Sequence, residues 1–229
     1  MKRLCVIAAL ALTACIQTTG GNVVSFDAVA RGTTEAAAPF TTPSGFDVTL
    51  TRARLTVGAL YLNQQNPQSY SLEQACIQEG IYSGEVRGGL VVDALSADAQ
   101  PFPVRGNGTD APTRAAELWL TGGDLLADDD KTVVLDVAGT ATRGAETFPF
   151  EGAFTIGTNR VIPPRNAALP GSNPLCRQRI VSPVAFDATL AEGSTVTLVV
   201  DARQWFAAVD FSGLAKVSDA PLLYRFTDS

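Results

Sequence analysis

Hydrophobic and polar residues alternate with a period close to two along most of the chain. From Val24 to Ala30, and again from Phe46 to Leu50, every second side chain is hydrophobic. That period is typical of a β-strand with one buried face. Less regular runs of the same kind predict six further strands: Ile81 to Leu95, Glu117 to Thr121, Val133 to Ala141, Thr147 to Ile156, Ile180 to Leu190 and Thr195 to Val200.

The parity of the hydrophobic positions changes once between two neighbouring runs. Leu55 to Ala59 follows the run that begins at Phe46, but its hydrophobic residues fall on the opposite parity. We therefore expect a bulge or bend near Arg54. Two later runs are separated only by a short turn at Arg143-Gly144, which predicts a β-hairpin.

Helix is predicted only as single turns. One lies near Leu72 to Ala75, and the other covers Ala202 to Phe206, where Asp201 can act as the N-cap. Short strands, frequent glycine and the lack of a long run with period 3.6 predict an all-β fold. Our expectation is a single antiparallel β-sandwich, immunoglobulin-like, with short helical turns.

The first residues carry a targeting signal. Lys2 and Arg3 form a positive head, and the hydrophobic stretch from Leu4 to Leu12 is too short to span a bilayer. It leads into Leu12-Thr13-Ala14-Cys15, which resembles the lipobox of bacterial lipoproteins. The resemblance implies a diacylglyceryl group on the Cys15 thiol, cleavage of the chain before this residue, and an acyl group on the new amino terminus.

This motif divides the chain into three parts. Residues 1–14 are the expected signal peptide, residues 15–22 the lipidated cysteine with a flexible tether, and residues 23–229 the β-sandwich domain. Ile16 stands where some bacteria place the Asp that retains lipoproteins in the inner membrane. The resemblance therefore favours an outer-membrane lipoprotein whose domain faces the periplasm or the cell surface.

Composition excludes several classes of function. The chain contains no histidine, which removes Ser-His-Asp and Cys-His catalysis and His-ligated zinc and copper sites. Loss of Lys2 and Arg3 with the signal leaves 15 basic against 23 acidic residues, a net charge of −8. Lys and Arg form no cluster, so nucleic acid is not an expected partner.

Two cysteines remain once the signal and the lipidated residue are set aside. In an oxidising compartment, Cys76 and Cys176 predict one disulfide, with a pair of free buried thiols as the alternative. Each lies at the end of a polar, proline-containing segment, Asn63 to Gln74 and Ile162 to Pro174 respectively. Loops of this length are often functional.

A disulfide between these loops would bring Tyr70, Arg165 and Arg177 into one neighbourhood. Aromatic and guanidinium groups together suit a binding surface. These three residues are the predicted binding site. The alternative is that the bridge only keeps two long loops from fraying.

The acidic residues give weaker signals. Asp124, Asp128, Asp129 and Asp130 fall between two predicted strands, and Ca²⁺ prefers oxygen-rich loops of this kind. The EF-hand spacing is absent, so a polar turn is the simpler interpretation, and we assign neither a metal nor a cofactor. A carbohydrate-active hydrolase that uses paired carboxylates needs no histidine and is the alternative function.

The most distinctive stretch of the domain is Val199 to Phe206, followed by Val209-Asp210-Phe211. It resembles the closing segment of MbnP-like periplasmic β-sandwich proteins, a family linked to copper handling. The resemblance implies a periplasmic β-sandwich. The His-bearing features of that family have no counterpart in this chain, so no copper site is carried over.

These observations together predict a lipid-anchored envelope lipoprotein that acts as a binding or interaction module and is not an enzyme. The expected partners are the membrane, through the lipid, and an envelope protein or a glycan.

The lipobox makes the first prediction. Replacing Cys15 with Ser removes the only thiol at the motif, so the protein should leave the membrane fraction or stay unprocessed. Radiolabelled palmitate should enter the wild type and not Cys15→Ser. Equal labelling of the two proteins would exclude a lipid on this residue.

Overall fold

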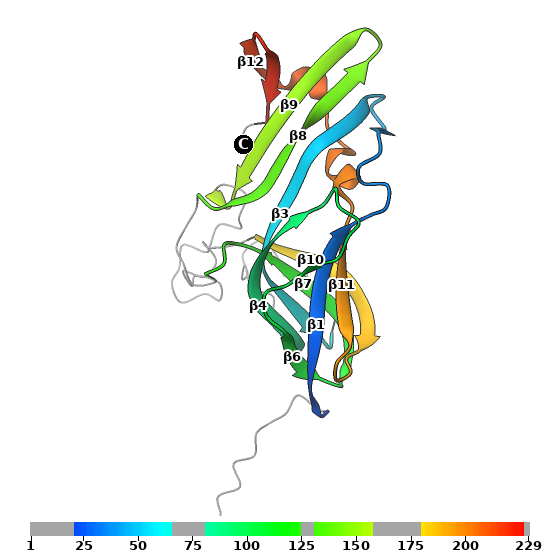
Figure 1. Ribbon diagram of the computed structural model, residues 1–229, viewed down its shortest axis with the longest axis vertical. Coiled ribbons are helices and arrows are strands. Elements are labelled where there is room, and N and C mark those ends of the chain that lie inside the picture. The colour runs from blue at the N-terminus through cyan, green and yellow to red at the C-terminus, as the bar shows by residue number, and fades with distance from the viewer. Residues whose placement is uncertain (1–20, 66–80, 125–130, 158–179, 227–229) are drawn as a thin grey trace, which may run out of the picture.

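The computed structural model describes residues 21–65, 81–124, 131–157 and 180–226 (Figure 1). Strands dominate this part of the chain, which confirms the all-β fold class. The strands are β1 (Val23–Gly32), β2 (Phe40–Thr41), β3 (Asp47–Asn63), β4 (Tyr82–Asp93), β5 (Gln100–Pro101), β6 (Gly106–Thr109), β7 (Pro112–Leu120), β8 (Val133–Arg143), β9 (Glu146–Thr155), β10 (Ile180–Thr189), β11 (Thr195–Val200), β12 (Ala215–Asp219) and β13 (Leu222–Arg225). Two short 3₁₀ helices, η3 (Ala202–Phe206) and η4 (Phe211–Gly213), lie between β11 and β12.

Strand β3 runs along the molecule and joins its two halves. Its 17 residues would span roughly 50 Å at the usual rise of a strand. One edge of β3 pairs with β4, whereas the other edge pairs first with β8 and then, from Ala59 onward, with β7. The upper half therefore contains β8, β9, β13 and β12, and the lower half contains β7, β10, β4, β6, β1 and β11 (Figure 1).

A bulge in β3 explains the change of parity in the sequence. The pairing with β8 slips by one residue between Leu50 and Arg52, so Thr51 is the extra residue. Buried positions move from Val48 and Leu50 to Ala53, Leu55 and Val57 across this point. The bulge was expected near Arg54, and it lies slightly earlier in the chain.

Two strand pairs differ from the antiparallel arrangement that the sequence predicted. Strand β11 runs parallel to β1, from Asp27 opposite Thr195 to Gly32 opposite Val200. Strand β13 runs parallel to β9 at Tyr224 and Arg225. Parallel neighbours need a long connection. Most of the chain separates β1 from β11, so no local sequence pattern predicts that the two strands pair.

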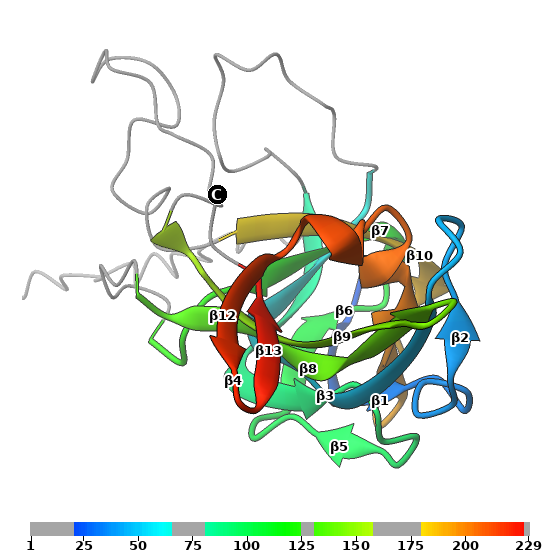
Figure 2. The ribbon, with the colours of Figure 1, turned by 90° about the horizontal axis from the view of Figure 1, so that it is seen from above.

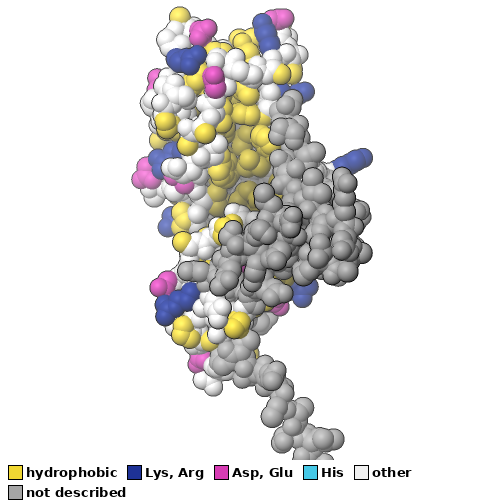
Figure 3. Space-filling model, turned by 180° about the vertical axis from the view of Figure 1, so that it is seen from behind, with side chains coloured by type: hydrophobic (Ala, Val, Ile, Leu, Met, Phe, Trp, Pro, Cys, Tyr) yellow, Lys and Arg dark blue, Asp and Glu magenta, His cyan; other side chains and the backbone are white. Residues whose placement is uncertain are grey.

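Aromatic side chains fill the core of the upper half. The Phe150 ring lies 4.9 Å from that of Phe211 and 5.6 Å from that of Phe206, and Phe46 lies 5.3 Å from Phe211. The two 3₁₀ helices bring Phe206 and Phe211 onto this sheet. Seen from above, β12 and β13 lie at one side of this half and β2 at the other (Figure 2). From behind, hydrophobic side chains gather in a hollow of the upper half (Figure 3).

The predicted hairpin and helical turn are both confirmed. Strands β8 and β9 form the hairpin, with Arg143 opposite Glu146 and a positive φ of 62° at Gly144. A positive φ at the first of two central residues is the pattern of a type II′ turn. The turn predicted at Leu72 to Ala75 lies outside the described residues.

Asp201 caps η3 as expected. Its carboxylate accepts hydrogen bonds from the Arg203 backbone N–H at 3.2 Å, from Arg203 Nε at 2.9 Å and from Arg203 Nη2 at 3.1 Å. The hydrogen bonds from the Arg203 side chain, opposed by partial burial, lower the pKa of the Asp201 carboxyl. The cap thereby links the end of β11 to the helix that carries Phe206 into the core.

Asp201→Ala should lower the free energy of unfolding by about 1 kcal/mol at neutral pH, because the cap and the ion pair are lost together. The folded pKa of Asp201 lies below its unfolded value of about 3.9. The contribution of this carboxylate is therefore complete above that value, and it disappears as the pH falls through the folded pKa. Denaturant titrations across this range should show the two proteins converging in acid.

Asp219→Ala is the control, since Asp219 is a solvent-exposed aspartate that pairs with Lys216 at the surface. A loss in Asp219→Ala equal to that in Asp201→Ala would contradict the role assigned to the cap.

Candidate functional site

The residues predicted to bind a partner, to form the disulfide and to carry the lipid all lie outside the described part of the chain. This applies to Tyr70 and Cys76 in residues 66–80, to Arg165, Cys176 and Arg177 in residues 158–179, and to Cys15. The structure does describe the residues that flank both loops. These residues lead to a candidate site.

Both loops return to the sheet at one aromatic cluster. Tyr82 follows the first loop and Val181 follows the second, and both pack against Ala59, Tyr61 and Trp119. The ends of the first loop also meet each other, because the Gln64 N–H donates to the Ile81 carbonyl at 2.8 Å.

The rings of this cluster pack against one another at tilted angles. The Tyr61 ring lies 4.2 Å from the Trp119 ring and 5.1 Å from the Tyr82 ring. Tyr61 comes from β3, Trp119 from β7 and Tyr82 from β4. Even-numbered neighbours such as Leu60, Leu62 and Leu118 face the main core instead. Alternation along β3 and β7 therefore places the cluster on the other face of the sheet.

A buried carboxylate lies among these rings. Glu117 is only 1% exposed, and its Oε2 accepts hydrogen bonds from Trp119 Nε1 at 3.4 Å and from the Tyr82 hydroxyl at 3.5 Å. Glu117 lies directly opposite Tyr61, which on its other side lies opposite Glu85. Two strand spacings separate the two glutamates, about 10 Å between their Cα atoms.

Asn63 adds a buried amide to the same region. It is fully buried next to the bulge of β4, and it lies opposite Ala115 and Tyr82. Among the described residues, neither Nδ2 nor Oδ1 of Asn63 has a hydrogen-bond partner. A buried amide without partners is costly, so it suits a position that meets a water molecule or a ligand group. We call Asn63, Tyr61, Tyr82, Glu117 and Trp119 the Glu117 cluster.

Sequence reasoning missed the Glu117 cluster. One signal was available at Glu117, which interrupts the apolar run from Ala115 to Leu120 with a charge. A charged residue in a buried strand needs partners, and this makes it a candidate for a site. One partner, Trp119, lies two residues further along the same strand, whereas Tyr82 comes from β4 and is brought to Glu117 only by the strand order.

The acidic turn is only partly described. Asp124 lies within the structure, and Asp128, Asp129 and Asp130 lie outside it. Across the described ranges, no three His, Cys, Asp or Glu residues gather as a metal site. The helices of the same ranges include none with the length and hydrophobicity needed to cross a membrane.

Two shallow depressions lie elsewhere on the surface. One, of about 370 Å³, lies beside Phe40, Arg203 and Gln204, and the guanidinium of Arg203 is already held by Asp201. The other, of about 330 Å³, lies between the Arg52–Asp136 and Arg225–Glu151 ion pairs. In both, each cation already has a carboxylate partner, so neither depression offers an unpaired charge to a ligand.

Comparison of the chain with protein-family models, with curated proteins and with solved structures finds no match. The resemblance to MbnP-like proteins and to the lipobox therefore stays a prediction, carried by the residues quoted for it.

The unpartnered amide of Asn63 gives a test of the cluster. Asn63→Leu replaces two orphaned polar atoms with an apolar group of similar size, so the free energy of unfolding should rise by about 1 kcal/mol. Leu62→Asn, the reverse change at the next residue, faces the main core and should lower it. Denaturant titration measures both. A loss of stability in Asn63→Leu would mean that the amide has a partner in the folded protein.

Proposed function

We propose that this chain is a lipid-anchored envelope lipoprotein whose β-domain acts as a binding module and not as an enzyme. The anchor is proposed from Leu12-Thr13-Ala14-Cys15 after a charged head and a hydrophobic stretch. The outer membrane is the proposed location, with the domain facing the periplasm or the cell surface. An envelope protein or a glycan is the proposed partner.

One observation supports the binding module above all others. Tyr82 and Val181, the residues that follow the two long loops, pack on the same aromatic cluster. Two loops that rejoin the sheet at the same cluster can present their side chains on one surface. The proposed binding surface of Tyr70, Arg165 and Arg177 requires this. The aromatic rings and the amide below them are of the kind found in binding sites.

The positions at which the two loops rejoin the sheet also support a disulfide between Cys76 and Cys176. Cys76 lies five residues before Ile81, and Cys176 lies four before Ile180. Segments of that length can span roughly 17 and 14 Å. Both start beside the same cluster, so the two sulfurs are within reach of each other. Such a bridge would preorganise the loops and reduce the entropy that they lose on binding.

A sandwich arrangement of the sheet is part of the proposal. Val196 and Leu198 of β11 share one core with Leu60 and Leu62 of β3, although three strands separate β11 from β3 in the sheet. A core shared by residues so far apart in strand order is what a sheet folded over on itself would produce.

A hydrolase that uses paired carboxylates is the second candidate, favoured by the alignment of Glu85 and Glu117 on either side of Tyr61. Residues in one row of a sheet point to the same face, so the two carboxyl groups share a face as a pair of catalytic carboxylates would. Glu117 is buried, however, whereas a general acid has to reach its substrate. Binding therefore remains the preferred function, and loss of a glycan-cleaving activity in both Glu85→Gln and Glu117→Gln would reverse that preference.

Photocrosslinking in the native envelope tests the binding surface. A photoreactive residue at Tyr70 or at Arg165 should capture a partner, and one at Asp129 should not. Adding Cys176→Ser should reduce capture from the first two positions, because the loops lose their bridge. Capture from Asp129 alone would move the surface to the acidic turn. So would a calcium-dependent rise in melting temperature that Asp128→Ala/Asp130→Ala abolishes.

A further inference from the structure

The first described residues of the chain are held firmly at one end of the domain. Asp110 accepts hydrogen bonds from the Asn22 backbone N–H at 2.6 Å and from Asn22 Nδ2 at 2.9 Å. The Asp110 N–H donates back to the Asn22 carbonyl at 3.0 Å. These three hydrogen bonds fix the point at which the N-terminal segment joins β1. We call them the Asn22 clamp.

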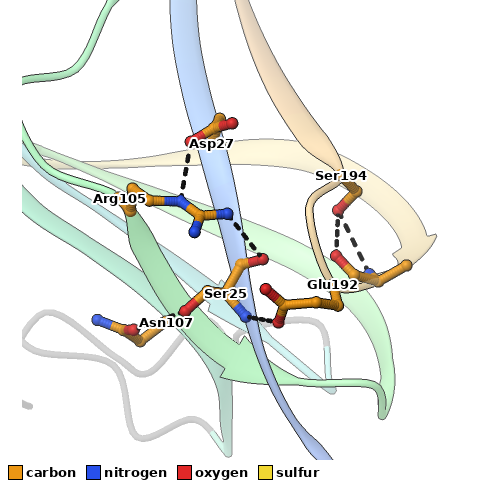
Figure 4. Close-up of polar contacts among 7 residues, drawn as sticks. Ser25, Asp27, Arg105, Asn107, Glu192 and Ser194 are labelled. Atoms are coloured by element: carbon orange, nitrogen blue, oxygen red, sulfur yellow. Dashed lines mark hydrogen bonds and ion pairs between the residues drawn. The ribbon is translucent and has the colours of Figure 1, made fainter.

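The next residues are bound from both sides. The Ser25 N–H donates to Glu192 at 2.7 Å, and Arg105 reaches Asp27 at 3.0 Å and the Ser25 carbonyl at 3.4 Å (Figure 4). Glu192 belongs to the turn between β10 and β11, and Arg105 precedes β6. The direction in which the chain leaves the domain is therefore set by contacts from three parts of the sheet.

The Glu117 cluster lies in the same row of the sheet as this anchored segment. Ser25 lies opposite Asn107, Asn107 opposite Glu85, and Glu85 opposite Tyr61. Tyr61 in turn lies opposite Glu117. The cluster is thus in the lower half of the molecule, where β1 begins, and away from the β8–β9 hairpin at the other end (Figure 1).

We propose that the end of the domain formed by the start of β1 and the β10–β11 turn faces the lipid headgroups of the anchoring membrane. The β8–β9 hairpin then points away from the bilayer. This inference rests on the proposed lipid anchor. Six residues lie between Cys15 and Asn22, so the chain between the two can reach about 25 Å at most. The Glu117 cluster, which shares a row of the sheet with Ser25, then lies in the half of the domain nearer the membrane.

Charge keeps this end from inserting into the bilayer, while the tether keeps it near the headgroups. Asp110 and Glu192 lie at the clamped end, and the mature domain carries a net charge of −8. An anionic surface is repelled by anionic headgroups, so the tether sets the distance from the bilayer.

Energy transfer to a headgroup-labelled lipid tests the orientation. Ala191 in the β10–β11 turn and Ala145 in the β8–β9 turn are matched exposed alanines at opposite ends. The lipidated full chain, carrying a fluorescent residue at one or the other position, is reconstituted in vesicles with the acceptor lipid. Transfer should be strong from Ala191 and weak from Ala145. Equal transfer, or stronger transfer from Ala145, would overturn the proposal.

A variant of the Asn22 clamp tests whether the clamp sets this orientation. Asp110→Ala frees the start of β1, so the difference between the two positions should shrink by at least half. Asp219→Ala, a surface change at the opposite end, should leave it unchanged. An Asp110→Ala protein with the full difference would show that the clamp does not set the orientation.

A second way of attaching the domain to vesicles distinguishes a failure of the proposed lipid anchor from a failure of the proposed orientation. A chain with six histidines in place of Cys15, bound to a nickel-chelating lipid, carries the same clamp and should give the same order of transfer. If palmitate labelling fails while this order holds, the proposed lipoprotein function is wrong and the geometry stands. If labelling succeeds and the order fails, only the orientation is wrong.

Discussion

The hydrogen-bond ladder along β3 is the interaction on which the rest of the structure depends. One edge of β3 carries β4, and the other edge carries β8 and then β7, so both halves of the sheet attach to this strand. The bulge at Thr51 allows the residues of β3 on either side of it to face the same core. A slip of one residue changes the face of every side chain beyond it. Val48 before the bulge and Val57 after it therefore belong to one core, although their positions differ in parity.

Continuity of β3 also creates the candidate site. Beyond Val57 the strand is buried on both faces, with Leu60 and Leu62 in the main core and Tyr61 in the aromatic cluster. A strand with two buried faces can hold polar groups away from water. Glu117 and Asn63 occupy such positions, where a charge and an amide would otherwise be costly. This cost is the physical reason for including them in the candidate site.

Local features were predictable from the sequence, and long-range ones were not. The alternation of hydrophobic and polar residues predicted the eight longest of the described strands, and Asp201 predicted the N-cap of η3. Both signals depend on only a few neighbouring residues. The strands β2 and β5 have two residues each, too short for a period to appear. The parallel pairing of β11 with β1, and the meeting of Tyr61 with Glu117, depend on strand order. The binding residues Tyr70, Arg165 and Arg177 remain a prediction, since they lie outside the described residues.

The placing of β1 between two neighbours has a mechanical consequence. Its first residues pair with β6 and its later ones with β11, and the N-terminal segment continues from its end. A pull on that segment acts along the strand, whereas the ladder hydrogen bonds lie across it. The load is therefore shared as shear among many bonds at once, and they cannot open one after another. A domain held by its N-terminus in this way resists extraction by force better than one held by a terminal hairpin.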